Sequence, residues 1–202
     1  MLKSFSLAVA GATLLLGGCT SYRTTPVDVT RYHLGQPLER TSVAVEPMNN
    51  AATVSPEYQL YADAVGVELA RLGYVATPNP LSSGYIAAVA FNRMPRGAFR
   101  EPPPVSIGLG GGSFGGGRRG GGVGVGGGVS FGVGGKTREV TGTELWVQLK
   151  RRSDNTVVWE GRAQAQSVSG TKGSDPRDSA ARLAAALFKG FPGESGVTIT
   201  VK

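Results

Sequence analysis

Alternation of apolar and polar residues predicts most of the strands in this chain. Residues 27–34, VDVTRYHL, begin with the alternation of Val27 and Val29, and residues 41–47, TSVAVEP, place Val43 and Val45 on one face, which is typical of a strand with one buried face. Residues 83–91, SGYIAAVAF, are almost continuously apolar and predict a buried strand. Three further strands are expected at residues 138–152, 155–169 and 196–202. The sequence SDN suits a tight turn that joins the first two of these as a hairpin.

Two helices are predicted from their end signals and from apolar residues at helical spacing. Ser55 stands where an N-cap belongs, Pro56 takes the first helical position, and Gly73 provides the left-handed stop. The second helix has Asp175 as its cap and Pro176 as its first residue. The expected core-facing residues are Tyr61, Val65, Leu69 and Leu72 in the first helix and Ala180, Leu183, Ala184, Leu187 and Phe188 in the second.

The order of these elements predicts the fold class. A strand, a helix, several strands, a helix and a last strand favour an α+β two-layer sandwich, with a mainly antiparallel sheet and two helices packed on one face. We expect residues 27–202 to form a single α+β domain with two interruptions. Residues 92–104 are proline-rich and are expected to break regular structure, and residues 105–135 form a long glycine-rich insertion.

The first residues predict export and lipidation. A basic start is followed by an apolar stretch, Phe5–Leu16, which is too short for a transmembrane helix of about 20 residues and fits a signal-peptide core. The following LGGC sequence resembles a bacterial lipobox, which implies a signal peptide at 1–18, cleavage between Gly18 and Cys19, and acyl chains on Cys19. Residues 19–26 would then be a lipidated tether. By resemblance to enteric sorting, Thr20 after the cysteine implies the outer membrane, with the domain facing the periplasm.

The glycine tract permits three interpretations. Residues 123–133 alternate strictly between Val or Phe and Gly or Ser, with Gly127 as the exception on the apolar side, and residues 105–109 alternate in the same way. The tract could be a mobile loop, because glycine is the residue whose backbone costs most to order. It could be a β-hairpin that extends the sheet or pairs with another chain. It could also insert into a membrane, which would require a closed oligomeric barrel.

Charge gives a weaker indication of partners. The net charge is +7, but the cations are scattered and are typical of a solvated basic surface. Arg118 and Arg119 lie in the middle of the glycine tract and are candidate anion contacts. The expected partners are the membrane through the lipid anchor and another envelope protein or an anionic envelope polymer. We expect no nucleic-acid partner, and homo-oligomerisation stays open.

No residue pattern supports catalysis or metal binding. The sequence SFGVGGKT at 130–137 ends like a phosphate loop, but residue 130 is serine where the loop requires glycine, and a β-rich stretch follows instead of a helix. His33 and Cys19 are the only histidine and cysteine, so we read His33 as a strand residue. Trp146 and Trp159 are expected in core or cross-strand packing. We therefore predict a non-enzyme with no metal and no cofactor other than the acyl group on Cys19.

Several short motifs in a fixed order resemble one known family. They are the lipobox, VTRYH at 29–33, LARLGY at 69–74, the glycine tract, VVWEGRA at 157–163 and FPG at 191–193. Together they are similar to the Gram-negative lipoprotein family called domain of unknown function forty-one thirty-six. The resemblance implies an envelope lipoprotein and no established catalytic residues.

These observations predict an outer-membrane lipoprotein that acts as a non-catalytic accessory or binding module in an envelope assembly. Two alternatives stay open. The first is an oligomeric pore or export component that uses a hairpin at 105–135. The second is a carrier that holds a lipid or another amphiphile between the sheet and the helices.

Overall fold

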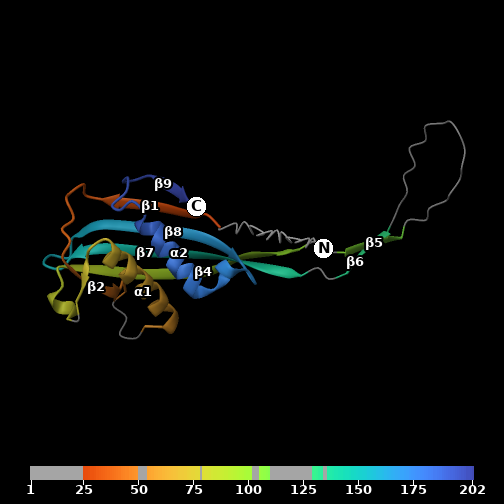
Figure 1. Ribbon diagram of the computed structural model, residues 1–202, viewed down its shortest axis with the longest axis horizontal. Helices are drawn as coiled ribbons and strands as arrows, with labels where there is room; N and C mark the ends of the chain where they lie inside the picture. The colour runs from red at the N-terminus through yellow and green to blue at the C-terminus, as the bar shows by residue number, and fades with distance from the viewer. Residues whose placement is uncertain (1–24, 50–53, 78, 102–104, 110–128, 134–135) are drawn as a thin grey trace, which may run out of the picture.

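Figure 1 shows the chain as a computed structural model, which describes residues 25–49, 54–77, 79–101, 105–109, 129–133 and 136–202. The predicted signal peptide, its cleavage site at Gly18 and Cys19, and the candidate anion contacts Arg118 and Arg119 lie outside the described residues.

The main sheet has seven strands in the order β3-β2-β4-β7-β8-β1-β9. Their bounds are β1 Val27–His33, β2 Ser42–Pro47, β3 Val75–Ala76, β4 Tyr85–Arg100, β7 Thr137–Arg151, β8 Val157–Val168 and β9 Thr198–Val201. Strand β2 runs parallel to β3 and β4, and the other neighbours are antiparallel. Short 3-10 turns at Pro80–Ser82 and Lys172–Ser174 precede β4 and the second helix.

Both helices pack on the same face of this sheet (Figure 1). Helix α1, Pro56–Arg71, begins at Ser55, whose hydroxyl accepts a hydrogen bond from the Tyr58 amide at 3.1 Å, and Gly73 after it has φ +90°. Helix α2, Pro176–Phe188, begins at Asp175, whose carboxylate accepts from the two amides that follow Pro176. The predicted caps and the α+β sandwich with two helices on one face are therefore confirmed.

The expectation that residues 92–104 break regular structure is wrong for residues 92–100. Strand β4 continues to Arg100 and stays paired with β7 along its whole length, with one register shift between Pro95 and Gly97. The register shift is a β-bulge, which lets the ladder continue past a proline that cannot donate a hydrogen bond and past Gly97 at φ +124°. Residues 102–104 lie outside the described residues.

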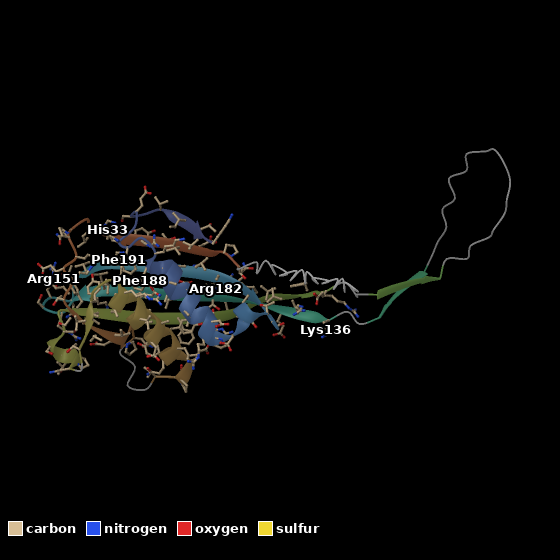
Figure 2. The ribbon with its side chains drawn as sticks, in the orientation of Figure 1. His33, Lys136, Arg151, Arg182, Phe188 and Phe191 are labelled. Atoms are coloured by element: carbon tan, nitrogen blue, oxygen red, sulfur yellow. The ribbon has the colours of Figure 1, made fainter. Side chains whose placement is uncertain are left out.

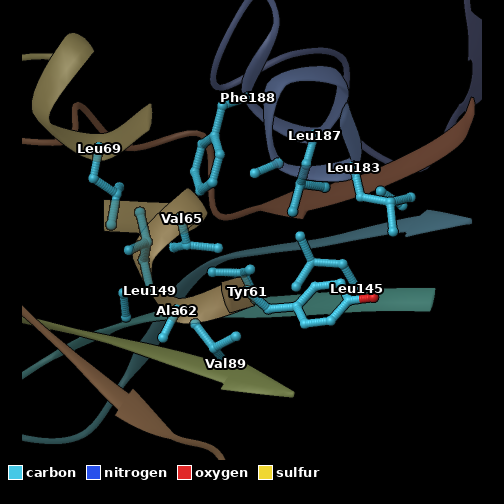
Figure 3. Packing of buried hydrophobic residues seen from close by; sticks show 14 of the residues in the cluster. Tyr61, Ala62, Val65, Leu69, Val89, Leu145, Leu149, Leu183, Leu187 and Phe188 are labelled. Carbon is cyan, nitrogen blue, oxygen red and sulfur yellow. The ribbon is translucent and has the colours of Figure 1, made fainter. Parts of the chain in front are cut away.

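The core lies between the helices and the sheet (Figure 3). Tyr61, Val65 and Leu69 of α1 are fully buried, whereas Leu72, which was expected in the same stripe, is only partly buried because it caps the helix. Every predicted core residue of α2 is buried. From the sheet, the inward residues include Val29, Val89, Leu145, Val147, Leu149 and Ala163.

Within the glycine-rich insertion the structure describes two short paired segments. Strand β5, Val105–Leu109, runs antiparallel to β6, Val129–Val133, in a register that places Val105 opposite Val133 and Leu109 opposite Val129. This pairing is what the hairpin interpretation requires of these residues. Residues 110–128 lie outside the described part, so the hairpin tip and the membrane-insertion interpretation stay predictions.

Candidate functional site

Four of the short motifs meet at one end of the domain, which Figure 2 shows around His33, Phe188 and Phe191. We call Arg31, His33, Trp159, Phe191 and Gly193 the motif cluster. Arg31 follows Val27 and Val29 on the inward face of β1 and is only 3% exposed. Its guanidinium donates to the carbonyl oxygens of Ala186, Leu187 and Lys189 at 2.9–3.0 Å.

These three bonds occupy carbonyl groups at the end of α2 that have no partner inside the helix. Placing a cation there also complements the negative end of the helix dipole. Burial lowers the pKa of Arg31, but a guanidinium stays charged in proteins. Arg31 therefore fixes the end of α2 to strand β1.

The aromatic residues of the cluster pack against one another and against the backbone. Trp159 is fully buried, stacks on Phe188 with ring centroids 5.4 Å apart, and donates from Nε1 to the Pro192 carbonyl at 3.0 Å. Phe191 lies 5.1 Å from the Trp159 ring and precedes a cis peptide bond to Pro192. The core packing predicted for Trp159 is therefore present.

His33 ends strand β1, and both ring nitrogens contact backbone groups. Nε2 donates to the Gly193 carbonyl at 3.2 Å, and Nδ1 accepts from the Gly35 amide at 3.1 Å. The placement agrees with the prediction that His33 is a strand residue. The His33 ring therefore links the segment at Gly35 to the segment at Gly193.

At the same end, Arg40 lies over the buried ring of Tyr74. The Arg40 guanidinium donates to the Tyr74 hydroxyl at 2.8 Å and lies 4.9 Å from the centre of the Tyr74 ring. Burial raises the pKa of Tyr74, and the nearby Arg40 charge opposes that rise. Since these groups use their polar atoms on one another, this end of the molecule holds the fold together and leaves little for a ligand.

The opposite face of the sheet has a different character. The helices leave it uncovered (Figure 1), and we call it the open face. Polar side chains from β9, β1, β8 and β7 lie on it and contact each other across the strands. The contacts are Thr30 with Thr198, Thr200 with Asp28, Gln148 with Glu160, Gln164 with Glu144, and Arg162 over the Trp146 ring.

A hollow of about 260 Å³ lies on the open face beside the point where the chain enters the domain. Thr25 and Pro26 form one wall. The floor is Gly142, across which the Arg96 side chain lies, so that a Cβ on Gly142 would come within 2.8 Å of Arg96 Nε. Carboxylates, amides and one methionine complete the lining: Asp28, Glu144, Gln164, Gln166, Asn92 and Met94. We call it the open-face hollow. It offers donors and acceptors of both kinds, which suits a polar ligand or a peptide.

A second, more apolar depression lies at the edge of the sheet where α1 begins. Its lining includes Pro47, Val54, Tyr58, Phe91 and Trp146, and its volume is about 560 Å³. Burial raises the pKa of Tyr58 to about 12, and the nearby Glu46 carboxylate adds to that rise. We call this depression the edge hollow. Residues 50–53 between β2 and α1 lie outside the described part of the chain.

Several polar atoms between the helices and the sheet lack partners among the described residues. They are Tyr58 Oη, Tyr61 Oη, Ser179 Oγ, Arg93 Nε, and Nε and Nη2 of Arg182. Burial lowers the pKa of Arg182, and Asp178 on the same helix opposes this. These atoms belong to the half of the domain where Glu57 pairs with Arg93 at 2.7 Å, away from the motif cluster.

The described residues give no arrangement for metal chemistry, because they contain no group of three His, Cys, Asp or Glu side chains close enough to hold an ion. No helix in the described part is both long and apolar enough to cross a membrane. Thr137, the last residue of the phosphate-loop-like sequence, begins strand β7. A helix N-terminus, which a phosphate loop needs, is therefore missing at that point.

Sequence reasoning found the motifs but missed the sites. Cys19, Gly18, Arg118 and Arg119 lie outside the described residues, so their predicted roles remain predictions. The open-face hollow was not predicted, because it depends on strands that are far apart in sequence. The role of Arg31 had a signal that could have been used: it occupies the inward position that follows two valines in an alternating strand.

The resemblance carried by the motif order agrees with a comparison against known families. The family model described as Domain of unknown function (DUF4136) matches residues 23–193. The chain belongs to this family.

Individual relatives and structures add little about activity. An uncharacterized protein of Zymomonas mobilis is 33% identical, and the match covers 89% of this chain and 81% of that protein. Two PelC dodecamer structures from Paraburkholderia phytofirmans are similar at 17% and 15% identity, with TM-scores of 0.41 and 0.42, covering 79% of this chain and 92% and 93% of theirs. A PDZ domain protein from Parabacteroides distasonis has a TM-score of 0.45 at 8% identity, covering 88% of this chain and 39% of that one.

Proposed function

We propose that the chain is an outer-membrane-anchored lipoprotein whose domain lies in the periplasm and acts as a non-catalytic binding module in an envelope assembly. The observation that carries the proposal is the open face. A sheet with helices on one side only presents its other side to solvent, and here that side carries polar side chains and the open-face hollow beside Thr25 and Pro26.

The position of the hollow supports a module that works near its anchor. The lipobox motif ends at Cys19, six positions before Thr25. A partner that binds the open-face hollow would therefore be held close to the membrane surface. The motif cluster is a less suitable binding site, because its polar atoms already form hydrogen bonds within the chain.

The anchor is tested by acylation and fractionation. We expect the mature protein to carry acyl mass on Cys19 and to fractionate with the outer membrane, and a Cys19→Ala variant to lose both. A mature chain that is free of acyl mass and freely soluble would contradict the anchor.

The binding role is tested by photo-crosslinking in cells. A crosslinking residue at Gln166, in the open-face hollow, should give one discrete adduct. The same residue at Asp63, exposed on α1, serves as the matched control and should give none. Equal adducts at both positions, or none at Gln166, would contradict binding at the open face.

An oligomeric pore or export component is a second candidate, favoured by the antiparallel pairing of β5 with β6. A membrane-crossing strand needs about 9–11 residues, so this candidate requires the pairing to continue beyond Leu109 and Val129. It predicts ring-shaped oligomers in detergent that are lost when residues 105–135 are deleted. A strict monomer under all conditions would exclude it.

A carrier of a lipid or amphiphile is a third candidate. Side chains fill the space between the sheet and the helices (Figure 3), so the edge hollow is the place that favours this role. Native mass spectrometry of the protein extracted from membranes should then show a bound lipid, and Phe91→Ala should weaken its retention. Lipid-free protein in both cases would contradict the carrier role.

A further inference from the structure

Strands β4 and β7 extend beyond the rest of the sheet as a two-stranded ribbon. Strand β7 pairs with β8 only from Val140 onwards, whereas its pairing with β4 continues to Thr137 opposite Arg100. We call residues 94–100 of β4, together with Lys136 and residues 137–142 of β7, the ribbon. Its outer part, residues 137–139 of β7, lies beyond the pairing with β8, whereas residues 140–142 still pair with β8. Figure 2 shows it leading away from the helices, with Lys136 labelled on it.

The β-bulge decides which residues share a face of the ribbon. Met94 pairs with Gly142 on the open face, and without the bulge Phe99 would lie on the opposite face. The register shift between Pro95 and Gly97 instead places Phe99 opposite Arg138, on the same side as Met94. Arg96, the bulged residue, lies across Gly142 on this side as well.

The resulting surface combines exposed apolar groups with cations. Met94 is 40% exposed and Phe99 45% exposed, and the Arg96 side chain is exposed on the same side. Lys136 is exposed and stands two positions before Arg138, so the alternation of an extended chain places it on this side as well. Glu101 is paired with Arg138 at 2.8 Å. Glu139 pairs in register with Ala98 and so lies on the opposite face.

The chain enters the domain at the level of this surface. Val27 pairs with Ala165, Ala165 with Thr143, and Thr143 with Arg93, so the start of β1 is level with the start of the ribbon. Thr25 and Met94 both line the open-face hollow. Six residues from Cys19 to Thr25 reach at most about 20 Å when fully extended, so an anchor at Cys19 keeps the ribbon near the bilayer.

We propose that the face of the ribbon formed by Met94, Arg96, Phe99 and Lys136 lies on a bilayer surface that carries anionic phospholipid headgroups. Apolar side chains that enter the boundary between headgroups and acyl chains, together with cations that meet the phosphates, are the combination that binds membrane interfaces. The inference rests on the proposed anchor at Cys19. It adds an orientation: the ribbon face is directed toward the membrane, and a partner in the open-face hollow, which Met94 and Arg96 also line, is held at the bilayer surface.

The test uses the acylated full-length chain in vesicles. Because Cys19 is the only cysteine and is acylated in the proposal, Phe99→Cys provides the only free thiol for a fluorescent probe. Ala98→Cys is the matched control, since Ala98 is the adjacent residue, is exposed and lies on the opposite face. In vesicles of phosphatidylcholine with phosphatidylglycerol, nitroxide-labelled lipid should quench the probe at position 99 several-fold more than at position 98.

Charge variants test the role of the headgroups. Replacing one cation near an anionic surface weakens partitioning about fivefold, so Arg96→Gln and Lys136→Gln should each reduce the quenching at position 99. Lys150→Gln, on β7 at the far end of the sheet, is the control and should leave it unchanged. Pure phosphatidylcholine, or salt raised to about 1 M, should also reduce the quenching.

The outcomes separate the inference from the proposed anchor. If the chain carries acyl mass and enters the vesicles but neither position is quenched, or both equally, the orientation is wrong while the anchor stands. Energy transfer between probes at position 99 of two copies would also overturn the inference, because a second copy would then cover the face.

If acyl mass is absent, the proposed anchor is wrong. Flotation of the unacylated chain with phosphatidylglycerol vesicles then tests whether the ribbon binds the bilayer without an anchor. Flotation that is lost in the Arg96→Gln, Lys136→Gln double variant supports the inference, and no flotation overturns it.

Discussion

The two ends of the domain differ in how they treat buried polar groups. In the motif cluster, Arg31, His33 and Trp159 all find partners in the backbone of the segment that ends α2. Toward the ribbon, Arg93 and Arg182 keep buried polar atoms without a partner among the described residues. A polar atom that is buried and bonded stabilises the fold, whereas one that is buried and unbonded costs free energy. The buried polar groups of the motif cluster therefore stabilise the fold, whereas those toward the ribbon lower its stability.

The largest expected effect is at Arg31. Arg31→Met should lower the free energy of unfolding by about 3–5 kcal/mol, because three buried carbonyl groups lose a charged donor. Arg162→Met is the control, since Arg162 lies on the open face over the Trp146 ring and should cost about 1 kcal/mol or less. Denaturant unfolding monitored by circular dichroism measures both. Equal losses of stability would mean that the buried hydrogen bonds of Arg31 contribute no more than the open-face contact of Arg162.

The next effect concerns two glycines with nearly the same φ. Gly193 and Gly196 have φ of +83° and +82°, but a Cβ on Gly193 would lie 2.7 Å from Arg31, whereas a Cβ on Gly196 meets nothing within 4 Å. Gly196→Ala should cost about 1 kcal/mol from backbone strain alone, and Gly193→Ala about 2–3 kcal/mol because Arg31 must also move. If thermal unfolding gives the same loss for both, Arg31 is not held as tightly as its hydrogen bonds indicate.

The unbonded hydroxyl of Tyr58 predicts a pH dependence in alkali. Its pKa is raised in the folded state from 10.0 to about 12 by burial and by Glu46. Ionisation of this phenol therefore leaves stability unaffected below pH 10 and lowers it as pH rises from 10 to 12, because the unfolded chain releases the proton more readily than the folded one. The free energy of unfolding of the Tyr58→Phe variant, measured by chemical unfolding, should fall less steeply between pH 10 and pH 12. Identical slopes for the two proteins would mean that the phenol ionises as it does in the unfolded chain.

The smallest effect is expected at Arg182, where the comparison with Arg31 is sharpest. Arg182→Met removes a partly buried cation whose Nε and Nη2 are shielded from solvent and have no partner among the described residues. Stability should stay unchanged or rise by about 1 kcal/mol, because an apolar side chain of similar length removes the cost of burying charge. A loss as large as that of Arg31→Met would show that Arg182 has a partner within the folded protein.

The helices were predictable because their signals are local. Ser55 with Pro56 and Asp175 with Pro176 act on amides within one turn, so the sequence contains the whole interaction. The end of β4 was not predictable in this way. Pro95 and Gly97 look like breakers along the chain, and only the partner strand β7 shows that a bulge absorbs them.

The candidate sites required the strand order, which no local pattern contains. The open-face hollow brings Thr25 beside Arg96 and Gln166, and that proximity follows from β1 lying next to β8. The motif residues could be recognised in the sequence, but their convergence on Arg31 depends on the pairing of β1 with β8.

The place of β1 in the sheet has a consequence for the order in which the protein acquires its structure. Strand β1 is the first part of the domain to be synthesised, yet its two neighbours, β8 and β9, are the last strands of the chain. Val27 and Val29 therefore have no strand to pair with until residues 157–201 exist, and both edges of β1 are available for wrong pairing during that time. The sheet can therefore be completed only after residues 157–201 have been synthesised, so the domain acquires its structure late and as a unit.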